Sequence, residues 1–328
     1  MCTAITYKTK DHYFGRNLDF EISYGEMVVI TPRNYPFKFR KNQEINKHYS
    51  IIGMGIVADN YPLYFDATNE KGLSMAGLNF PQNADYKLEK EGADNIATFE
   101  LIPWILGQCA TISETEEKLK TINIISIGFN DELSTSPLHW IISDKEKSIT
   151  VECVKDGLKV YDNLVGVLTN NPTFDIQLFL LNNYMHLSTQ NPINQFSKDI
   201  ELKTYSRGMG AMGMPGDLSS QSRFVKAVFT KMNSVSGNTE NESVSQFFHI
   251  LESVYQQKGC VIVNEKDYEY TIYSSCCNTD KGIYYYKTYE NSQITGIDMY
   301  KEDLEGRKII TYPLKREQNI EIQNERKK

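Results

Sequence analysis

The first third of the chain alternates short apolar runs with turn residues. Residues 3–8 alternate apolar and polar side chains with the period of two that is typical of a strand. Met27–Thr31 and Gly72–Phe80 predict two further strands. Together these runs indicate an antiparallel sheet that is built from the N-terminus.

Two helical segments follow this sheet. Phe99–Cys109 is strongly apolar and contains Pro103, which predicts a kink or a late helix start. Ser113 and Glu116 form a capping-box pattern for a second helix that runs through Leu119. A third helix is expected further on, over Thr173–Leu187. Its apolar face would pack these side chains on one side: Phe174, Leu178, Leu181 and Met185.

The remaining elements also arrive in groups. We expect strands at Leu138–Ser143, Ser148–Val154, Leu158–Tyr161, Val165–Thr169, Tyr268–Cys276, Gly282–Tyr289 and Thr295–Tyr300, and helices at Ser222–Met232 and Val244–Gln257. Because helices do not alternate one by one with strands, a doubly wound parallel sheet is disfavoured. Two mixed or antiparallel sheets stacked between helical layers fit better. No break divides the chain clearly, so we expect one domain over residues 1–328.

Composition narrows the functional class. The 328 residues are 40% hydrophobic and 23% charged, which is enough to bury a large core. The net charge of −7 argues against a nucleic-acid partner, because such proteins normally present a basic surface. No apolar run approaches the roughly 20 residues of a membrane span. Lys8, Lys10 and Asp11 come before any signal-peptide core could form, so we expect a soluble cytoplasmic protein without a membrane partner.

The six cysteines do not suggest a metal or disulfide framework. The chain is long, its cysteine spacing is irregular, and it contains no C-x-x-C pair. The five histidines are scattered, so we expect no structural zinc. His139 and His249 lie in apolar stretches, and both are interpreted as core or packing residues.

Cys2 is the most informative residue because it follows Met1 directly. Methionine before a small residue is readily removed, and its removal would leave Cys2 with both a thiol and a free α-amine. One residue would then provide a nucleophile and a general base. By itself the pattern is weak, because an ordinary thiol at a chain end would look the same.

The segment Gly15–Asp19 gives Cys2 possible partners. If Cys2 starts the first strand, the returning strand would bring Arg16 and Asp19 back beside it. Arg16 is a permanent cation that would favour a thiolate, and Asp19 could accept a hydrogen bond from the α-amine. The alternative is a surface Arg–Asp pair, which contributes little.

Asparagines close two of the predicted strands, at Asn79 and at Asn170. A side-chain amide can stabilise a tetrahedral oxyanion, and losing one such donor typically costs about 10²–10³ in rate. Turn formation is an equally good explanation for both residues.

Arg223 follows Ser219 and Ser220, either of which could cap a helix. A cation in the first helical turn opposes the helix dipole, so Arg223 should have a specific anionic partner. That partner is either a structural Asp or part of a site, and the structural case is the more common one. The chain contains no G-x-G-x-x-G, Walker or G-x-S-x-G motif, so nucleotide binding and serine-hydrolase chemistry have no support.

These segments, taken together and in order, resemble the choloylglycine hydrolases, and most closely the bile salt hydrolases of Gram-positive gut bacteria. The resemblance covers nearly the whole chain and rests on these segments: Met1–Thr3, Gly15–Asp19, Asn69–Leu73, Ala76–Phe80, Leu168–Asn170, Leu218–Phe224 and Tyr289–Asn291.

The resemblance implies an α+β fold, the four-layer αββα sandwich of N-terminal-nucleophile hydrolases. It implies hydrolysis of the amide that joins glycine or taurine to a bile acid, without a metal or organic cofactor, by a homotetramer. Cys2 matches the nucleophile, with Arg16 and Asp19 beside it. Asn79 and Asn170 match the oxyanion and substrate-orienting asparagines, and Arg223 matches the remaining catalytic arginine.

A bile-acid steroid requires a broad apolar cleft. We expect its walls to include these side chains, although any of them could be simple core: Leu18, Tyr24, Phe65, Phe129 and Leu133.

Two other functions remain open. A penicillin V acylase would use the same nucleophile, but that branch often has tyrosine at the position of Asn79. A non-catalytic carrier of bile acids or lipids would be expected to have lost Cys2, Arg16, Asp19 or Asn170, and all four are present.

Overall fold

The computed structural model describes residues 1–324 and contains two large sheets. The first has seven strands in the order β12-β1-β2-β14-β15-β16, and β13 also pairs with β14. Its strands are β1 (Cys2–Lys8), β2 (His12–Phe20), β12 (Val167–Leu168), β13 (Val261–Val263), β14 (Asp267–Asn278), β15 (Ile283–Thr288) and β16 (Thr295–Asp298). The N-terminal strand therefore lies inside this sheet, between β12 and β2.

The second sheet has eight strands in the order β11-β10-β9-β6-β5-β4-β3-β17. They are β3 (Met27–Thr31), β4 (Ile51–Ala58), β5 (Tyr61–Asn69), β6 (Ser74–Asn79), β9 (Leu138–Ser143), β10 (Ser148–Val154), β11 (Gly157–Asp162) and β17 (Ile310–Pro313). A small parallel pair joins β7 (Asp94–Ala97) to β8 (Ile122–Ile125). All the pairings within the two large sheets are antiparallel, in agreement with the sequence prediction.

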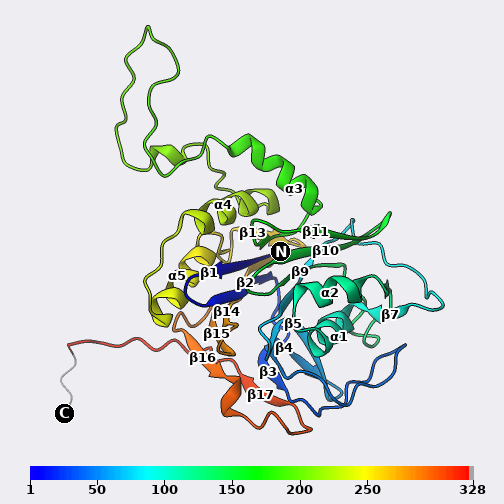
Figure 1. Ribbon diagram of the computed structural model, residues 1–328. Coiled ribbons are helices and arrows are strands. Elements are labelled where there is room, and N and C mark those ends of the chain that lie inside the picture. Colours follow the sequence, from blue (N-terminus) through cyan, green and yellow to red (C-terminus); the bar gives the residue numbers. More distant parts are fainter. Residues whose placement is uncertain (325–328) are drawn as a thin grey trace.

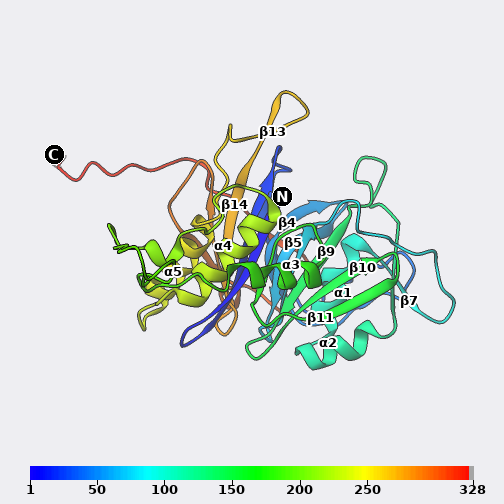
Figure 2. The same ribbon diagram turned by 90° about the horizontal axis from the view of Figure 1, so that it is seen from above.

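Helices cover the outer face of each sheet. α1 (Leu101–Gln108) packs on β5 and β6 of the eight-stranded sheet, and α2 (Ile112–Leu119) follows it on that side (Figure 1). α4 (Ser220–Asn233) and α5 (Glu240–Glu252) pack on β1, β2 and β14 of the other sheet. Figure 2 shows the two sheets between these helical layers. This is the four-layer αββα arrangement that the sequence predicts.

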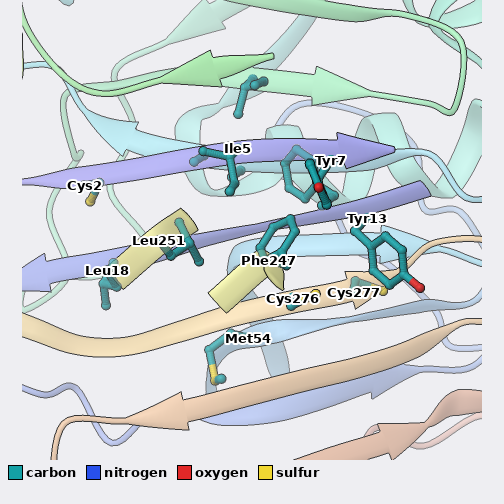
Figure 3. Close-up of a cluster of buried hydrophobic side chains, with 14 of the residues drawn as sticks. Cys2, Ile5, Tyr7, Tyr13, Leu18, Met54, Phe247, Leu251, Cys276 and Cys277 are labelled. Atoms are coloured by element: carbon teal, nitrogen blue, oxygen red, sulfur yellow. The ribbon is translucent and has the colours of Figure 1, made fainter. Parts of the chain in front are cut away.

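The alternation of side chains along each strand produces two cores. In β3, Val28 and Ile30 belong to a cluster shared with Cys2 and the helices α4 and α5, whereas Val29 belongs to a second cluster around α1. Figure 3 shows the first cluster, in which Cys2 and Leu18 lie on neighbouring strands. The N-terminal strand is therefore anchored in the core that joins the two sheets.

The sequence did not predict β4 or β5. Gly53 and Gly55 interrupt β4, but both are required there, because a Cβ at either position would lie within 2.3 Å of a carbonyl oxygen of β5. β5 carries Pro62 and several polar residues, which disguise a strand that is buried along most of its length.

Helix boundaries also differ from the predictions. The helix over 112–119 is capped by Thr111, whose hydroxyl accepts from the Glu114 N–H at 3.2 Å, and not by Ser113. The earlier start turns Ile112 into the core. α1 begins at Leu101 after a short 3₁₀ turn (Thr98–Glu100), which is the late start that Pro103 predicts.

The predicted helix Thr173–Leu187 is shorter than expected. α3 covers Phe174–Leu180, and a 3₁₀ turn continues over Leu181–Tyr184. Phe174 is buried, but Met185 is exposed, so the four apolar residues do not share one packed face. Met185 begins a segment of residues 185–208, here called the arm, which projects from the body at the top of Figure 1. A 3₁₀ turn (Met209–Ala211) follows the arm, and a last one (Met299–Lys301) follows β16.

Candidate active site

Cys2 is held through its main chain by two of the predicted site residues. It is buried at the start of β1, opposite Leu18 of β2. Its backbone N–H donates to Asn170 Oδ1 at 2.9 Å, and its carbonyl oxygen accepts from Arg223 Nη1. The position of this cysteine is therefore fixed by residues about 170 and 220 positions further along the chain.

Met1 is present, so the nitrogen of Cys2 belongs to a peptide bond. The Met1 ammonium donates to the Asp19 carbonyl oxygen at 2.7 Å and pairs with the carboxylate of Glu269. The Asp19 N–H donates back to the Met1 carbonyl oxygen at 2.9 Å. Met1 thus adds one more step to the pairing of β1 with β2.

Asn170 links the cysteine to the other predicted asparagine. It follows β12, which pairs with β1 through Leu168 and Ala4. Its Nδ2 donates to the carbonyl oxygen of Asn79 at 2.6 Å, and its Oδ1 accepts from Arg223 Nη2 at 2.7 Å. These partners settle which way the amide points, because only the oxygen can accept and only the nitrogen can donate. One N–H of Nδ2 donates to the Asn79 carbonyl oxygen, and the second N–H has no acceptor among residues 1–324.

Arg223 has the anionic partner that its place in the first helical turn predicts. Ser219 is the N-cap of α4, and Arg223 Nη1 lies 4.0 Å from Asp19 Oδ2. Both side chains are buried. Burial lowers the pKa of Arg223, and the charge of Asp19 opposes that change.

Asp19 is stabilised by groups that the sequence analysis missed. The Thr271 hydroxyl donates to Oδ1 at 2.6 Å, and Gln256 Nε2 donates to Oδ2 at 3.2 Å. Burial raises the pKa of Asp19, whereas Arg223 and the Thr271 hydrogen bond act in the opposite direction. Thr271 and Gln256 lie about 240 residues from Asp19, and nothing local in the sequence indicates the contact.

Arg16 is buried beside the same cysteine. Its Nη1 donates to the carbonyl oxygens of Phe65 at 3.1 Å and Gly77 at 2.5 Å. Its Nη2 has no hydrogen-bond partner among residues 1–324. Burial acts to lower the pKa of Arg16, but the acidic groups around it, led by Cys2, outweigh burial and raise the pKa above its usual range. Arg16 is therefore a charged donor with an unused N–H group.

An apolar cavity lies next to this site. It is lined by Tyr24, Ile56, Leu63, Tyr64, Phe65, Thr98, Phe99, Ile102, Phe129, Glu132, Leu133, Ser134, Ser136, Leu138 and Trp140. Four of the five residues predicted to bind substrate are in this lining. Leu18 is not, and it packs in the core beside Cys2 (Figure 3). Phe65 connects the two regions, because its side chain lines the cavity while its carbonyl oxygen holds Arg16.

The described residues also bear on metal binding and on membrane insertion. Within residues 1–324, no three His, Cys, Asp or Glu side chains gather in a way that could hold a metal ion. In the same residues, no helix has the length and apolar character needed to cross a membrane.

The whole chain resembles known amide hydrolases. The family described as linear amide C-N hydrolases, choloylglycine hydrolase family, matches residues 2–312. A bile salt hydrolase/transferase from Lactiplantibacillus plantarum is 58% identical over 317 residues, which cover 97% of this chain and 98% of that protein. The crystal structure of a mutant conjugated bile acid hydrolase from Clostridium perfringens has a TM-score of 0.91 and 38% identity, covering 99% of this chain and 100% of that one. A penicillin V acylase from Agrobacterium tumefaciens, with a TM-score of 0.76 and 19% identity over 95% of this chain and 91% of that one, shares the fold.

Proposed function

The chain belongs to the choloylglycine hydrolase family of linear amide C-N hydrolases, and from this premise we propose that it hydrolyses glycine- or taurine-conjugated bile salts. Its fold is the αββα sandwich of N-terminal-nucleophile hydrolases. One observation carries the proposal: Cys2 lies in contact with Asn170 and Arg223 and beside Arg16, next to an apolar cavity. The products would be the free bile acid and the amino acid.

The proposed reaction begins after removal of Met1, which leaves Cys2 with its own α-amine. The thiol gives its proton to this amine, and the sulfur attacks the carbonyl carbon of the substrate amide. The oxyanion that forms accepts a hydrogen bond from the second N–H of Asn170 Nδ2. We assign the side chain of Asn79 to substrate orientation in the same region. Arg16, with its unused N–H group, supplies the positive charge beside the sulfur.

Breakdown of the intermediate uses the same amine in reverse. The α-ammonium returns its proton to the leaving nitrogen of glycine or taurine, and the acyl group stays on sulfur as a thioester. Water then attacks the thioester carbonyl carbon while the amine takes a proton from it. The C–S bond breaks, the bile acid leaves, and the ammonium returns the proton to the sulfur of Cys2. Asp19 and Arg223 lie 4.0 Å apart, and we assign them to holding the N-terminal residue in place throughout.

The cavity suits the steroid part of the substrate. Aromatic and aliphatic side chains dominate its lining, and we assign Tyr24, Phe65, Phe129 and Leu133 to contact with the steroid. Leu18, which packs beside Cys2, would act through the nucleophile and not through the steroid. Because Phe65 also borders Arg16, a steroid in the cavity would have its acyl end near Cys2.

The test compares three substrates and two cysteine variants. Wild-type protein should release glycine from glycocholate and taurine from taurocholate faster than it releases phenoxyacetate from penicillin V. Cys2→Ala should abolish all three activities and keep the same thermal unfolding midpoint. Cys260→Ala is the matched control, because Cys260 is an exposed thiol outside the site and its loss should change nothing. Turnover that survives in Cys2→Ala would refute the mechanism, and a preference for penicillin V would identify an acylase.

We also propose that the enzyme works in the cytoplasm as a homotetramer. The arm and α3 expose large apolar side chains, which single soluble chains normally avoid in such numbers. These side chains are Phe179, Met185, Ile193, Phe196 and Tyr205. Light scattering should give four times the chain mass, and Phe196→Ser together with Ile193→Ser should reduce it. A monomeric wild-type protein would contradict the assembly, and recovery of activity outside the cytoplasm after cell fractionation would contradict the location.

A further inference from the structure

A carboxylate that the proposed reaction does not use lies buried between the two sheets. Asp66 of β5 is 1% exposed. It accepts hydrogen bonds from the hydroxyls of Tyr273 at 2.7 Å, Tyr284 at 2.6 Å and Ser275 at 3.1 Å, all on strands of the opposite sheet. An ionised carboxylate can only accept, so three donors fit an ionised Asp66. Such a charge is tolerated in a core only when it is hydrogen-bonded and electrically balanced.

Arg16 is the cation that balances Asp66. Two short paths join the two residues. The main-chain N–H of Arg16 donates to Ser275 Oγ at 3.1 Å, and that hydroxyl donates to Asp66. The guanidinium of Arg16 donates through Nη1 to the carbonyl oxygen of Phe65, the residue before Asp66. Burial raises the pKa of Asp66, and Arg16 is the strongest influence in the opposite direction. Asp66 and Arg16 are therefore two buried, oppositely charged groups that are linked through Ser275 and the Phe65 carbonyl oxygen, with no direct ion pair between them in residues 1–324.

The other side of Arg16 faces Cys2. In the pairing of β1 with β2, Arg16 is opposite Ala4 and Leu18 is opposite Cys2. Residues opposite each other in an antiparallel pair point to the same face, so Cys2 and Arg16 are diagonal neighbours on one face of the sheet. Arg16 Nη1 is occupied by two carbonyl oxygens, whereas Nη2 has no partner among residues 1–324.

We propose that Asp66 is a positioning residue that, with the hydroxyls of Tyr273, Tyr284 and Ser275, fixes Arg16 so that its unused N–H group faces the sulfur of Cys2. The inference rests on the proposed function, because it needs Cys2 as the nucleophile. Asp66 acts only through Arg16 and does not touch the substrate. Its loss should disturb the chemical step more than substrate binding.

The first test removes the charge and keeps the shape. Asp66→Asn should lower kcat with glycocholate by about 10²-fold, the scale expected when a catalytic group shifts by about 1 Å, and leave KM within a few-fold. Glu100→Gln is the matched control, since Glu100 is a buried acid in the other core and caps the backbone there. An unchanged kcat in Asp66→Asn would overturn the proposal. So would an equal loss in Glu100→Gln.

The second test asks whether Asp66 acts through Arg16. In an Arg16→Met background, adding Asp66→Asn should cause no further loss of kcat, because the group it positions is already gone. An equal further loss in that background would overturn the proposal. If Asp66→Asn does not fold, Tyr284→Phe, which removes one donor to Asp66, should give a smaller loss with the same dependence on Arg16.

A substrate-free readout separates this inference from the proposed function. The rate at which iodoacetamide alkylates Cys2 can be measured by peptide mass spectrometry. This rate should differ between wild-type protein and Asp66→Asn. It should be the same in Arg16→Met and in the double variant. The exposed Cys260 provides the internal control in the same digest. An alkylation rate that is unaffected by Asp66→Asn would overturn the positioning role. A protein that shows the coupled alkylation but hydrolyses no bile salt would refute the proposed function alone.

Discussion

A chain that keeps Met1 should fold normally and fail to catalyse. With Met1 in place, the nitrogen of Cys2 is an amide whose N–H donates to Asn170 Oδ1, so it has no lone pair basic enough to take the thiol proton. The fold itself tolerates Met1, because its ammonium binds the Asp19 carbonyl oxygen and Glu269 while its carbonyl oxygen accepts from the Asp19 N–H. The fold therefore accommodates Met1, but the peptide bond between Met1 and Cys2 leaves the site without its base.

The size of the loss follows from the role of the missing group. A positioned general base typically contributes about 10²–10⁴-fold, which corresponds to about 3–5 kcal/mol of activation free energy. The proposed reaction uses the amine in both of its halves, so the upper part of this range is expected for kcat. Thermal unfolding should hardly change, since Met1 is accommodated by its hydrogen bonds with Asp19 and its ion pair with Glu269.

The assay compares two preparations of the same chain, one from cells treated with an inhibitor of methionine aminopeptidase and one from untreated cells. Intact mass measurement identifies the form with Met1, and glycine release from glycocholate gives kcat for each. A second expectation concerns access. Met1 is hydrogen-bonded to Asp19 of β2, and Cys2 is hydrogen-bonded to Asn170 and Arg223. Purified aminopeptidase should therefore remove Met1 from the unfolded chain and not from the folded one. Full kcat in a preparation that still carries Met1 would refute the role of the α-amine.

Three further outcomes are expected. Asn170→Ala should lower kcat by about 10²–10³-fold in the glycine-release assay, as loss of an oxyanion donor does, and a smaller effect than tenfold would exclude it from that role. Phe65→Ala and Leu133→Ala should raise KM for glycocholate by about tenfold while kcat changes less, because they remove apolar contact with the steroid; a selective loss of kcat would contradict the placement. His12 is buried with its pKa lowered to about 4, so the folded state binds fewer protons than the unfolded state, and the stability that His12 contributes is complete above about pH 6.5 and lost as pH falls towards 4. In urea unfolding, His12→Gln should remove up to ~3 kcal/mol of the change in unfolding free energy between pH 6.5 and pH 4. Parallel plots of unfolding free energy against pH for the wild-type protein and the variant would contradict this expectation.

The sequence indicated the proposed site residues because each of them lies in a short motif with its own local signal. Cys2 starts a strand, Asn170 follows one, and Arg223 follows a serine cap. The structure brings these three together, because the side chains of Asn170 and Arg223 bind the main chain of Cys2 across 168 and 221 residues of sequence. Only the family resemblance united them in advance, because no periodicity encodes which strand ends meet.

The parts that the sequence did not reveal share one physical cause, which is that they depend on the pairing of the two sheets. β4 looks like a broken strand until β5 lies against Gly53 and Gly55 and leaves no room for a Cβ. Asp66 looks like a surface acid until Tyr273 and Tyr284 arrive from the opposite sheet with hydroxyl donors. A carboxylate directly after the apolar run Leu63–Phe65 is the signal that could have been used, since an unpaired charge there would cost several kcal/mol. Such a residue indicates that a partner exists, and only the packed structure identifies the partners as the hydroxyls of Tyr273, Tyr284 and Ser275.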